Sequence, residues 1–503
     1  MSNYGDPYNT TLRDFVSNAP RLLDTLGREI PGSELEELLV FAMGSAPVSV
    51  PPYGLGIGYV RIKEVMGLTR AELIARGLEY GQNFGLTSAY RVANYVLEHW
   101  KSDPQRYTHH LWMLWAAGII GGDMIVLDLM ECFNEHRSRI KNQNDLLNII
   151  RGLGTNMTYT LMLDLKHRNW FAGKSVDRFI DKKAKREGIE REVWLDQHVP
   201  TCGLGARGLG ARSLGDISCG AHHYRLVIGE SLVPRLRDED GALSDEIPED
   251  LEGATIAERR DARLLWNLAR QQLETTIPIQ VARLEKAMLE ERIWSVASWK
   301  TLFTEHPLLR VLSEHALWGV FDLEQERLLE SFRVAQDMSL ANLEDETYEL
   351  PEGDHIGIRV VHPAHFTKQE KSAWVEIFVD YEMIELFPQV SRSTWPISSL
   401  PARASEIELL DYDEKEQSFV WSIMHGRGWK HRSKGRRMTF FKSFGDLKAS
   451  LVATSPLKGE HRWVFKGLDF HIKGERKAID ALEQLPVVGL SELLVDLDML
   501  LAQ

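Results

Sequence analysis

The chain has 503 residues, a formal net charge of −14 and an apolar content of 44%, which suit a soluble globular protein of roughly two to four domains. The acidic balance excludes a nucleic-acid binder that uses its whole surface, but it leaves room for a local basic patch. Three scattered cysteines exclude a disulfide scaffold and predict a cytoplasmic protein. The first residues lack the basic and apolar regions of a signal peptide, and no apolar stretch reaches the length of a membrane span.

The first hundred residues read as mostly helical, with helices expected from Ser33, over 69–77 and over 88–100. A loop over 46–60 interrupts them and carries glycine at every second position from Gly54 to Gly58. The spacing matches neither a P-loop nor GxGxxG, so we expect a closely packed loop rather than a phosphate site.

Residues 107–187 show an internal repeat of helical hairpins. Gly121 and Met124 recur at the same spacing as Gly154 and Met157, each between two apolar helical segments. Stacked helical hairpins are typical of a HEAT-like α-solenoid, which presents an extended binding surface. We therefore predict a helical-repeat region over 1–195. Its last helix, 171–191, has a basic face that we expect to be solvated.

Residues 196–253 change character and predict a small β-hairpin module followed by an acidic linker. Glycines cluster before an alternating strand at 223–228, and 237–253 is rich in acids. The GxGxxG pattern at 203–208 lacks the strand and helix that a dinucleotide site needs. A zinc site built from His198, Cys202, Cys219 and His222 is an alternative that the spacing does not favour, so we predict no metal and no cofactor.

Residues 254–503 predict an α+β domain with an antiparallel sheet. A helix over 257–289 is expected to break or kink at Pro278. Strands follow at 318–321, 328–334 and 356–361. Thr367 and Glu370 form a capping-box pattern, and the helix that they start should bury four aromatic or branched side chains, namely Trp374, Ile377, Phe378 and Tyr381.

Several short motifs in this domain resemble one known bacterial family. They are His306-Pro307-Leu308-Leu309, Ala316–Asp322, Phe332–Ala335, Gly357-Ile358 with His362-Pro363, and Asp380-Tyr381-Glu382 with Phe387-Pro388-Gln389. In this order they are similar to the domain of unknown function 4132, over roughly residues 105–503. The resemblance extends to proteins like the molybdate-metabolism regulator, often associated with WGR domains. It implies multi-component assemblies with AAA-type ATPases or von Willebrand A proteins as partners.

The same stretch offers a candidate catalytic set. His355, His362 and His365, with the acids Glu352 and Asp354, have the residue types of a metal or acid–base site. The alternative is structural, because His306 and His362 both precede proline, where a histidine ring commonly caps a turn. No nucleophile motif accompanies them.

A basic ribbon follows at 427–442, with Lys434-Gly435 as the expected hairpin tip. Its candidate binding residues are Arg427, Lys430, Arg432, Lys434, Arg436 and Arg437. They could hold nucleic acid or another polyanion, and the alternative is a solubilising hairpin. Around it we expect strands at 418–424, 461–465 and 468–473, and helices at 476–484 and 490–501.

Together these patterns predict a non-catalytic interaction, scaffold or regulatory protein of a bacterial multi-component system, with protein partners and no membrane contact. The first alternative is a nucleic-acid-linked regulator that uses the ribbon 427–442. The second is an enzyme of unknown reaction with a site around His355, His362 and His365.

Overall fold

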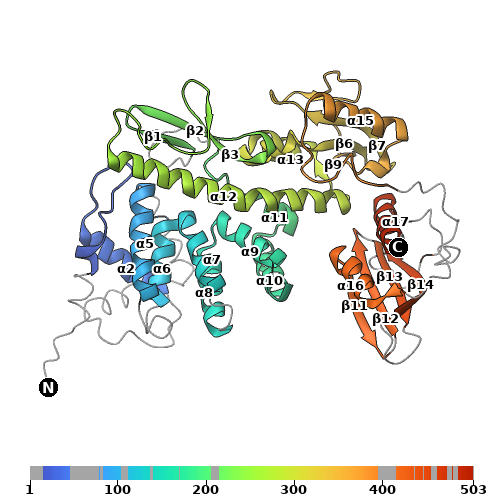
Figure 1. The fold of residues 1–503 in the computed structure, drawn as a ribbon, viewed down its shortest axis with the longest axis horizontal. Coiled ribbons are helices and arrows are strands. Elements are labelled where there is room, and N and C mark those ends of the chain that lie inside the picture. The colour runs from blue at the N-terminus through green and yellow to red at the C-terminus, as the bar shows by residue number, and fades with distance from the viewer. Residues whose placement is uncertain are drawn as a thin grey trace. The chain divides into compact units, whose positions relative to one another are not determined.

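The computed structural model describes residues 15–45, 79, 83–102, 111–135, 140–168, 170–204, 215–394, 415–435, 437–445, 447–454, 462–472, 479 and 485–501. Its contacts divide into two compact units, Met1–Ile279 and Gln280–Gln503. Helices occur beside antiparallel sheets, which confirms the α+β class (Figure 1). The domain boundaries predicted at 195 and 253 stay predictions. No helix in the described residues is long and apolar enough to cross a membrane.

The first unit begins with a layer of helices. They are α2 (Gly32–Ser45), α5 (Leu86–Ser102), α6 (Leu111–Gly121), α7 (Val126–Glu135), α8 (Ile140–Leu153), α9 (Asn156–Arg168), α10 (Trp170–Glu187) and α11 (Arg191–Gln197). The helices predicted from Ser33 and over 88–100, and those of the hairpin repeat, are present. The predicted loop at 46–60 and helix at 69–77 lie outside the described residues.

Glycines set how closely these helices approach. Gly122 and Gly154, between α6 and α7 and between α8 and α9, have φ of 53° and 64°, which side chains rarely adopt. Gly152 on α8 lies under the ring of Trp115 on α6, and a Cβ there would stand 2.0 Å from the ring. Trp115 is fully buried in the core that α2 and α5–α11 share.

A four-stranded antiparallel sheet and the part of helix α12 (Ile256–Leu289) up to Ile279 complete the first unit, and the rest of α12 belongs to the second unit. The strands run in sequence order: β1 (Asp216–Cys219), β2 (His222–Ile228), β3 (Pro234–Arg237) and β4 (Leu243–Ser244). The predicted acidic linker therefore supplies a strand as well as exposed acids. Helix α12 lies between this sheet and the helical layer (Figure 1). Its Trp266 donates a hydrogen bond to the carbonyl of Asp245, and its Gln272 donates one to that of Asp123.

Of the two outcomes predicted at Pro278, a break or a kink, the break is wrong, because α12 runs unbroken through the proline. Pro278 removes only one backbone donor. Buried apolar side chains on both sides of it, such as Leu273 and Leu284, hold the helix in place. Packing therefore outweighs the local penalty of about 3 kcal/mol for an interior proline.

The second unit contains a five-stranded antiparallel sheet in the order β5-β9-β6-β7-β8. Its strands are β5 (Trp294–Ser295), β6 (Leu317–Asp322), β7 (Arg327–Val334), β8 (Leu340–Ala341) and β9 (Ile356–Val360). The three longer strands confirm the predicted ones. Every residue of β6 is buried, as expected for a central strand with both faces covered.

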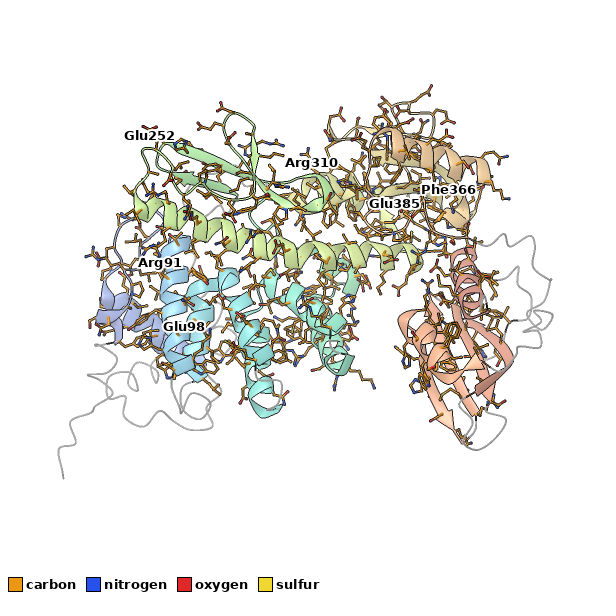
Figure 2. All side chains as sticks on the ribbon, in the orientation of Figure 1. Arg91, Glu98, Glu252, Arg310, Phe366 and Glu385 are labelled. Carbon is orange, nitrogen blue, oxygen red and sulfur yellow. The ribbon has the colours of Figure 1, made fainter. Side chains whose placement is uncertain are left out.

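Helices cover both faces of this sheet. Helix α15 (Lys368–Asp380) begins at the predicted capping box and buries Trp374 and Phe378 against Leu317 and Phe321. Phe366, labelled in Figure 2, packs against the same cluster. The prediction that this helix buries Tyr381 is wrong, because Tyr381 is 51% exposed.

The other face is covered by α13 (Val296–Lys300), a π-helical turn (Thr301–Glu305) and α14 (Pro307–Ser313). There, Trp318 of β6 packs on Trp299 and Phe303, with ring centroids 5.4 and 4.6 Å apart. Both faces of β6 are therefore closed by aromatic side chains.

A second five-stranded antiparallel sheet has the order β10-β14-β13-β12-β11. Its strands are β10 (Lys415–Glu416), β11 (Lys430–Lys434), β12 (Arg437–Phe444), β13 (Leu447–Thr454) and β14 (Arg462–Ile472). Two helices accompany it, α16 (Gln417–Gly426) and α17 (Val487–Leu501). The strand predicted at 418–424 is wrong, because these residues form α16. Val420 and Met424, four residues apart, bury one helical face. Apart from Ile479, which is not helical, the helix predicted at 476–484 lies outside the described residues.

We expect Gly152→Ala to lower stability by about 1–3 kcal/mol, because the new methyl group overlaps the buried Trp115 ring. Gly173→Ala on α10 is the matched control, since its Cβ would meet only Lys166 at an ordinary 3.7 Å. The midpoint of urea unfolding, followed by circular dichroism, measures both. Equal midpoints for the two variants would contradict the close packing of α6 on α8.

Candidate functional site

A group of charged side chains in the described part of the second unit centres on α17. This helix is apolar on most of its surface, yet two of its three carboxylates, Glu492 and Asp496, lie one turn apart on a buried side. Their side chains are only 2% and 1% exposed. Carboxylates at this depth must be paired, since an unpaired buried charge is strongly destabilising.

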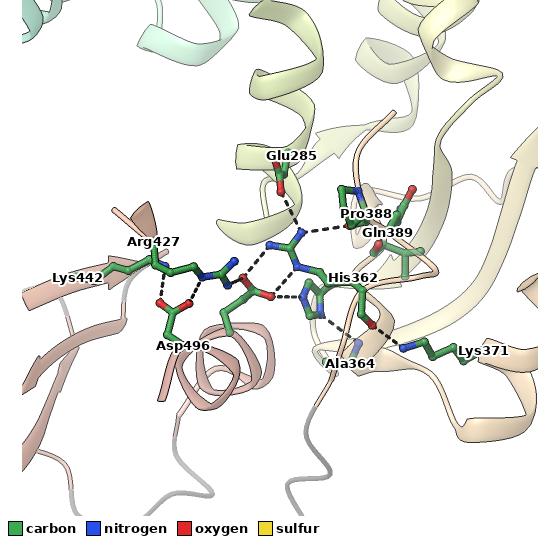
Figure 3. Close-up of polar contacts among 12 residues, drawn as sticks. Glu285, His362, Ala364, Lys371, Pro388, Gln389, Arg427, Lys442 and Asp496 are labelled. Carbon is green, nitrogen blue, oxygen red and sulfur yellow. Dashed lines mark hydrogen bonds and ion pairs between the residues drawn. The ribbon is translucent and has the colours of Figure 1, made fainter. Parts of the chain in front are cut away.

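Glu492 is held by an arginine and a histidine (Figure 3). Arg392 donates from Nε and Nη2 to its two carboxylate oxygens at 2.6 and 2.8 Å, a bidentate pair. His362 Nε2 lies 3.3 Å from Oε1. The backbone N–H of Ala364 donates to Nδ1 of the same ring at 3.1 Å. Nδ1 is therefore the acceptor, and Nε2 carries the proton that His362 donates to Glu492.

Asp496 accepts from three donors that come from the second sheet and the turn before it. Trp429 Nε1 donates at 2.8 Å and Lys442 Nζ at 2.7 Å. Arg427 Nε donates to the other oxygen, and its Nη2 lies 3.7 Å from Glu492. Arg427 thus links the two carboxylates of α17.

The segment 385–392 places Arg392. Gln389 is buried and hydrogen-bonds to both backbone groups of Leu317 and to the carbonyl of Val361, so it ties this segment to β6 and to the residue after β9. Glu385, labelled in Figure 2, accepts from the backbone N–H groups of Gln389 and Ser391. Arg392 Nη1 also donates to Glu285 of α12 at 2.9 Å. Contacts that do not involve α17 therefore also hold Arg392 in place.

Burial and pairing oppose each other in the titration of these groups. Burial alone would raise the pKa of Glu492, but the hydrogen bonds from Arg392 and His362 outweigh it and hold that pKa well below its usual range. Burial lowers the pKa of His362 despite the bond to Glu492. His362 is therefore neutral at pH 7, and Arg392 supplies the charge that balances Glu492.

Charges balance within the network. Three carboxylates (Glu285, Glu492 and Asp496) face three cations (Arg392, Arg427 and Lys442). Glu492 and Asp496 are both occupied by donors of the chain itself, whereas the third acid of α17, Asp498, is exposed. Such a closed arrangement is suited to joining the two sheets of this unit through α17.

The three candidate catalytic histidines have different surroundings. His355 is exposed on the turn before β9, as are Glu352 and Asp354. His362 belongs to the network above. His365 Nε2 lies 3.4 Å from Glu291, which also pairs with Arg359. No group of three metal-ligating side chains occurs among the residues that the structure describes.

The four residues considered for zinc also make separate contacts. His198 stacks on Trp194 and its Nδ1 lies 2.7 Å from that residue's carbonyl. Cys202 is buried with its Sγ 3.4 Å from the hydroxyl of Thr276. Cys219 is buried in β1, and His222 is exposed with Nε2 near the carbonyl of Glu252.

The basic ribbon divides into two groups. Arg427 belongs to the network rather than to the exposed cations, because it pairs with the buried Asp496. Lys430, Arg432 and Lys434 on β11 and Arg437 on β12 are exposed. In the strand register, Lys434 lies opposite Arg437 on the other side of the predicted hairpin tip. Arg436 lies outside the described residues.

Sequence reasoning did not find the acids of α17 or a histidine pair near the hairpin. His425 Nε2 and His431 Nδ1 lie 3.4 Å apart, and both rings pack on Trp421. The pair was hidden by the wrong strand prediction at 418–424. For α17 a signal existed: two acids spaced by one turn inside a mostly apolar helix imply buried partners.

Comparisons with known proteins agree with part of the sequence resemblance. Residues 250–429 match the family described as Domain of unknown function (DUF4132), within the span 105–503 expected from the motifs. The chain is 30% identical over 278 residues to the Uncharacterized protein YehI of Escherichia coli (strain K12). The aligned part is 54% of this chain but only 22% of that protein, so the chain spans about a fifth of the relative's length. No solved structure matches the chain significantly.

We expect Glu492→Gln to destabilise the protein by about 3–5 kcal/mol, because Arg392 and Arg427 then lose part of their charge compensation in a buried site. Glu290→Gln is the control, since its exposed pair with Lys286 contributes at most about 0.5 kcal/mol. Urea unfolding at pH 7 compares the two. A Glu492→Gln protein as stable as the control would show that the network does not hold α17.

Glu314, at the end of α14, predicts an unusual pH dependence. Burial raises its pKa to about 7, against a weaker opposing effect of Arg310. Because the folded-state pKa exceeds the unfolded value of 4.5, ionisation of Glu314 lowers stability as the pH rises. Glu314→Gln should therefore be more stable than the wild type at pH 8, with the difference shrinking through pH 7 and vanishing below pH 4.5. Thermal unfolding across this range tests it, and a constant difference would contradict it.

Proposed function

We propose that this chain is a non-catalytic interaction protein that acts as a scaffold or regulator in a cytoplasmic bacterial multi-component system. The observation that carries the proposal is the closed ion network around α17. The buried titratable groups of this network, including His362, are occupied by partners within the chain. They serve assembly of the unit, and a substrate would have to displace them.

The helical layer supports a binding role. Consecutive helices α5 and α6, α7 and α8, and α9 and α10 contact one another in pairs. The glycine turns at Gly122 and Gly154, which the sequence pattern places within the hairpins, lie between these pairs instead. We propose that they form a HEAT-like array, whose repeated hairpins offer an extended surface to a protein partner.

The sequence resemblance suggests which partners to seek. It implies AAA-type ATPases and von Willebrand A proteins, as well as a likeness to the molybdate-metabolism regulator and WGR-associated proteins. The match over 250–429 supports the family on which this rests.

A nucleic-acid-linked regulator is the second candidate. The exposed cations of β11 and β12 favour it, since Lys430, Arg432, Lys434 and Arg437 come from one hairpin.

Partner recovery after substitution of the candidate catalytic histidines separates a scaffold from an enzyme. We expect the full-length double variant His355→Gln/His365→Gln to recover the same stoichiometric partner from the native host as the wild type, and to restore the phenotype of a deletion strain. Gln keeps a donor near Glu291 but cannot act as an acid or base.

The matched control is Glu492→Gln, which disturbs the network and should weaken both readouts. If the histidine variant binds its partner but fails to restore the phenotype, a catalytic role replaces the proposal. If the wild type recovers no stoichiometric partner that also binds in purified form, the scaffold role is rejected.

A further inference from the structure

Among the described residues, helices cover one face of the sheet β10–β14 and leave the other face, called the open face below, without a helix, although Val452 on it is buried. Alternate residues of β12 and β13, including Phe440, Phe444, Leu447 and Leu451, form a core with α16 and α17. The residues between them point to the other side, because side chains alternate along a strand. In the described part of the chain, no helix packs on that side.

Cations gather on this open face. Strand register places Lys430, Arg432 and Lys434 of β11 beside Phe441, Thr439 and Arg437 of β12 respectively. Lys448 of β13 belongs to the same face, next to Ser443. These five cations, Lys430, Arg432, Lys434, Arg437 and Lys448, are exposed and have no ion pair among the described residues. Asp469 on β14 is the exposed acid that shares the face.

The net positive charge of this face is opposite in sign to that of the whole chain, which carries a formal charge of −14. A local cationic face on an acidic protein attracts a polyanion to one place and repels it elsewhere. Successive same-face residues of a strand lie about 6.6–6.8 Å apart, a spacing similar to that of phosphates in an extended single strand. The row on β11 therefore suits a backbone that runs along the strand.

An aromatic side chain completes the face. Phe441 is half-buried in the middle of the cations, and Lys448 Nζ lies 5.3 Å from its ring centroid. A ring on the open side of a sheet is a platform on which an unpaired base stacks. This feature favours nucleic acid over an acidic peptide, because bases stack on an aromatic ring and acidic side chains do not.

We propose that the open face of β11–β13 binds single-stranded nucleic acid, with Lys430, Arg432, Lys434, Arg437 and Lys448 contacting phosphates and Phe441 stacking on a base. The inference rests on the second candidate function and names its ligand and surface. Duplex DNA fits less well, because a broad sheet does not enter a groove and a paired base is not free to stack.

Fluorescence anisotropy with the full-length protein tests the proposal. The probes are labelled oligo-dT and oligo-U of about 12 nucleotides, within the range of ~4–16 nucleotides that sheet-based single-strand binders occupy. A duplex of the same length and poly-glutamate serve as competitors. We expect single strands to bind, and affinity to fall steeply between about 50 and 200 mM salt.

Two variants separate charge from stacking. Arg432→Glu/Lys434→Glu/Arg437→Glu should lower affinity at least about tenfold and reduce the salt slope by about 2, since each lost phosphate contact on a single strand removes ~0.7. Phe441→Leu should lower affinity about tenfold with an unchanged slope, because it removes only stacking.

The matched control is Lys182→Glu/Lys185→Glu/Arg186→Glu on α10, which changes the net charge equally at three exposed positions and should leave binding unaltered.

The proposal is overturned if the wild type shows no salt-sensitive binding, or if the α10 variant loses as much affinity as the hairpin variant. Equal competition by duplex with no effect of Phe441→Leu would make the face a general polyanion surface. Equal competition by poly-glutamate would assign it to an acidic protein. Recovery of the protein partner by the hairpin variant shows whether the scaffold function stands independently of this result.

Discussion

The pairing of Glu492 and Asp496 with partners outside α17 is the interaction on which the second unit depends. An apolar helix can be buried from several sides only if its polar groups are satisfied. Arg392 and His362 reach Glu492 from the first sheet of the unit, and Lys442 and Trp429 reach Asp496 from the second. The two acids therefore let one helix join both sheets.

The constraint explains details that otherwise look unrelated. His362 keeps its proton on Nε2 because the turn at Ala364 occupies Nδ1. Gln389 is buried because it holds the chain that carries Arg392. A motif that reads as a catalytic histidine before proline is, in three dimensions, one donor in a structural ion network.

Patterns of neighbouring residues are enough to predict the elements that short-range interactions stabilise. The capping box at Thr367, the continuous apolar strand β6 and the hairpin tip at Gly435 each follow from a few neighbouring residues. The network was not predictable in this way, since Arg392 and His362 lie 100 and 130 residues from Glu492. Arg427 was grouped with the exposed cations because a charge run does not show which of its members a distant acid recruits.

The position of β11 at the edge of its sheet has one more consequence. An edge strand leaves a row of backbone donors and acceptors unpaired, and such a row can pair with the same strand of another molecule. Lysine and arginine side chains on β11 oppose that pairing by mutual repulsion. The charges for which we propose a nucleic-acid ligand thus also disfavour pairing of this edge with another copy of the strand. Neutral replacements at Lys430, Arg432 and Lys434 would remove both properties together.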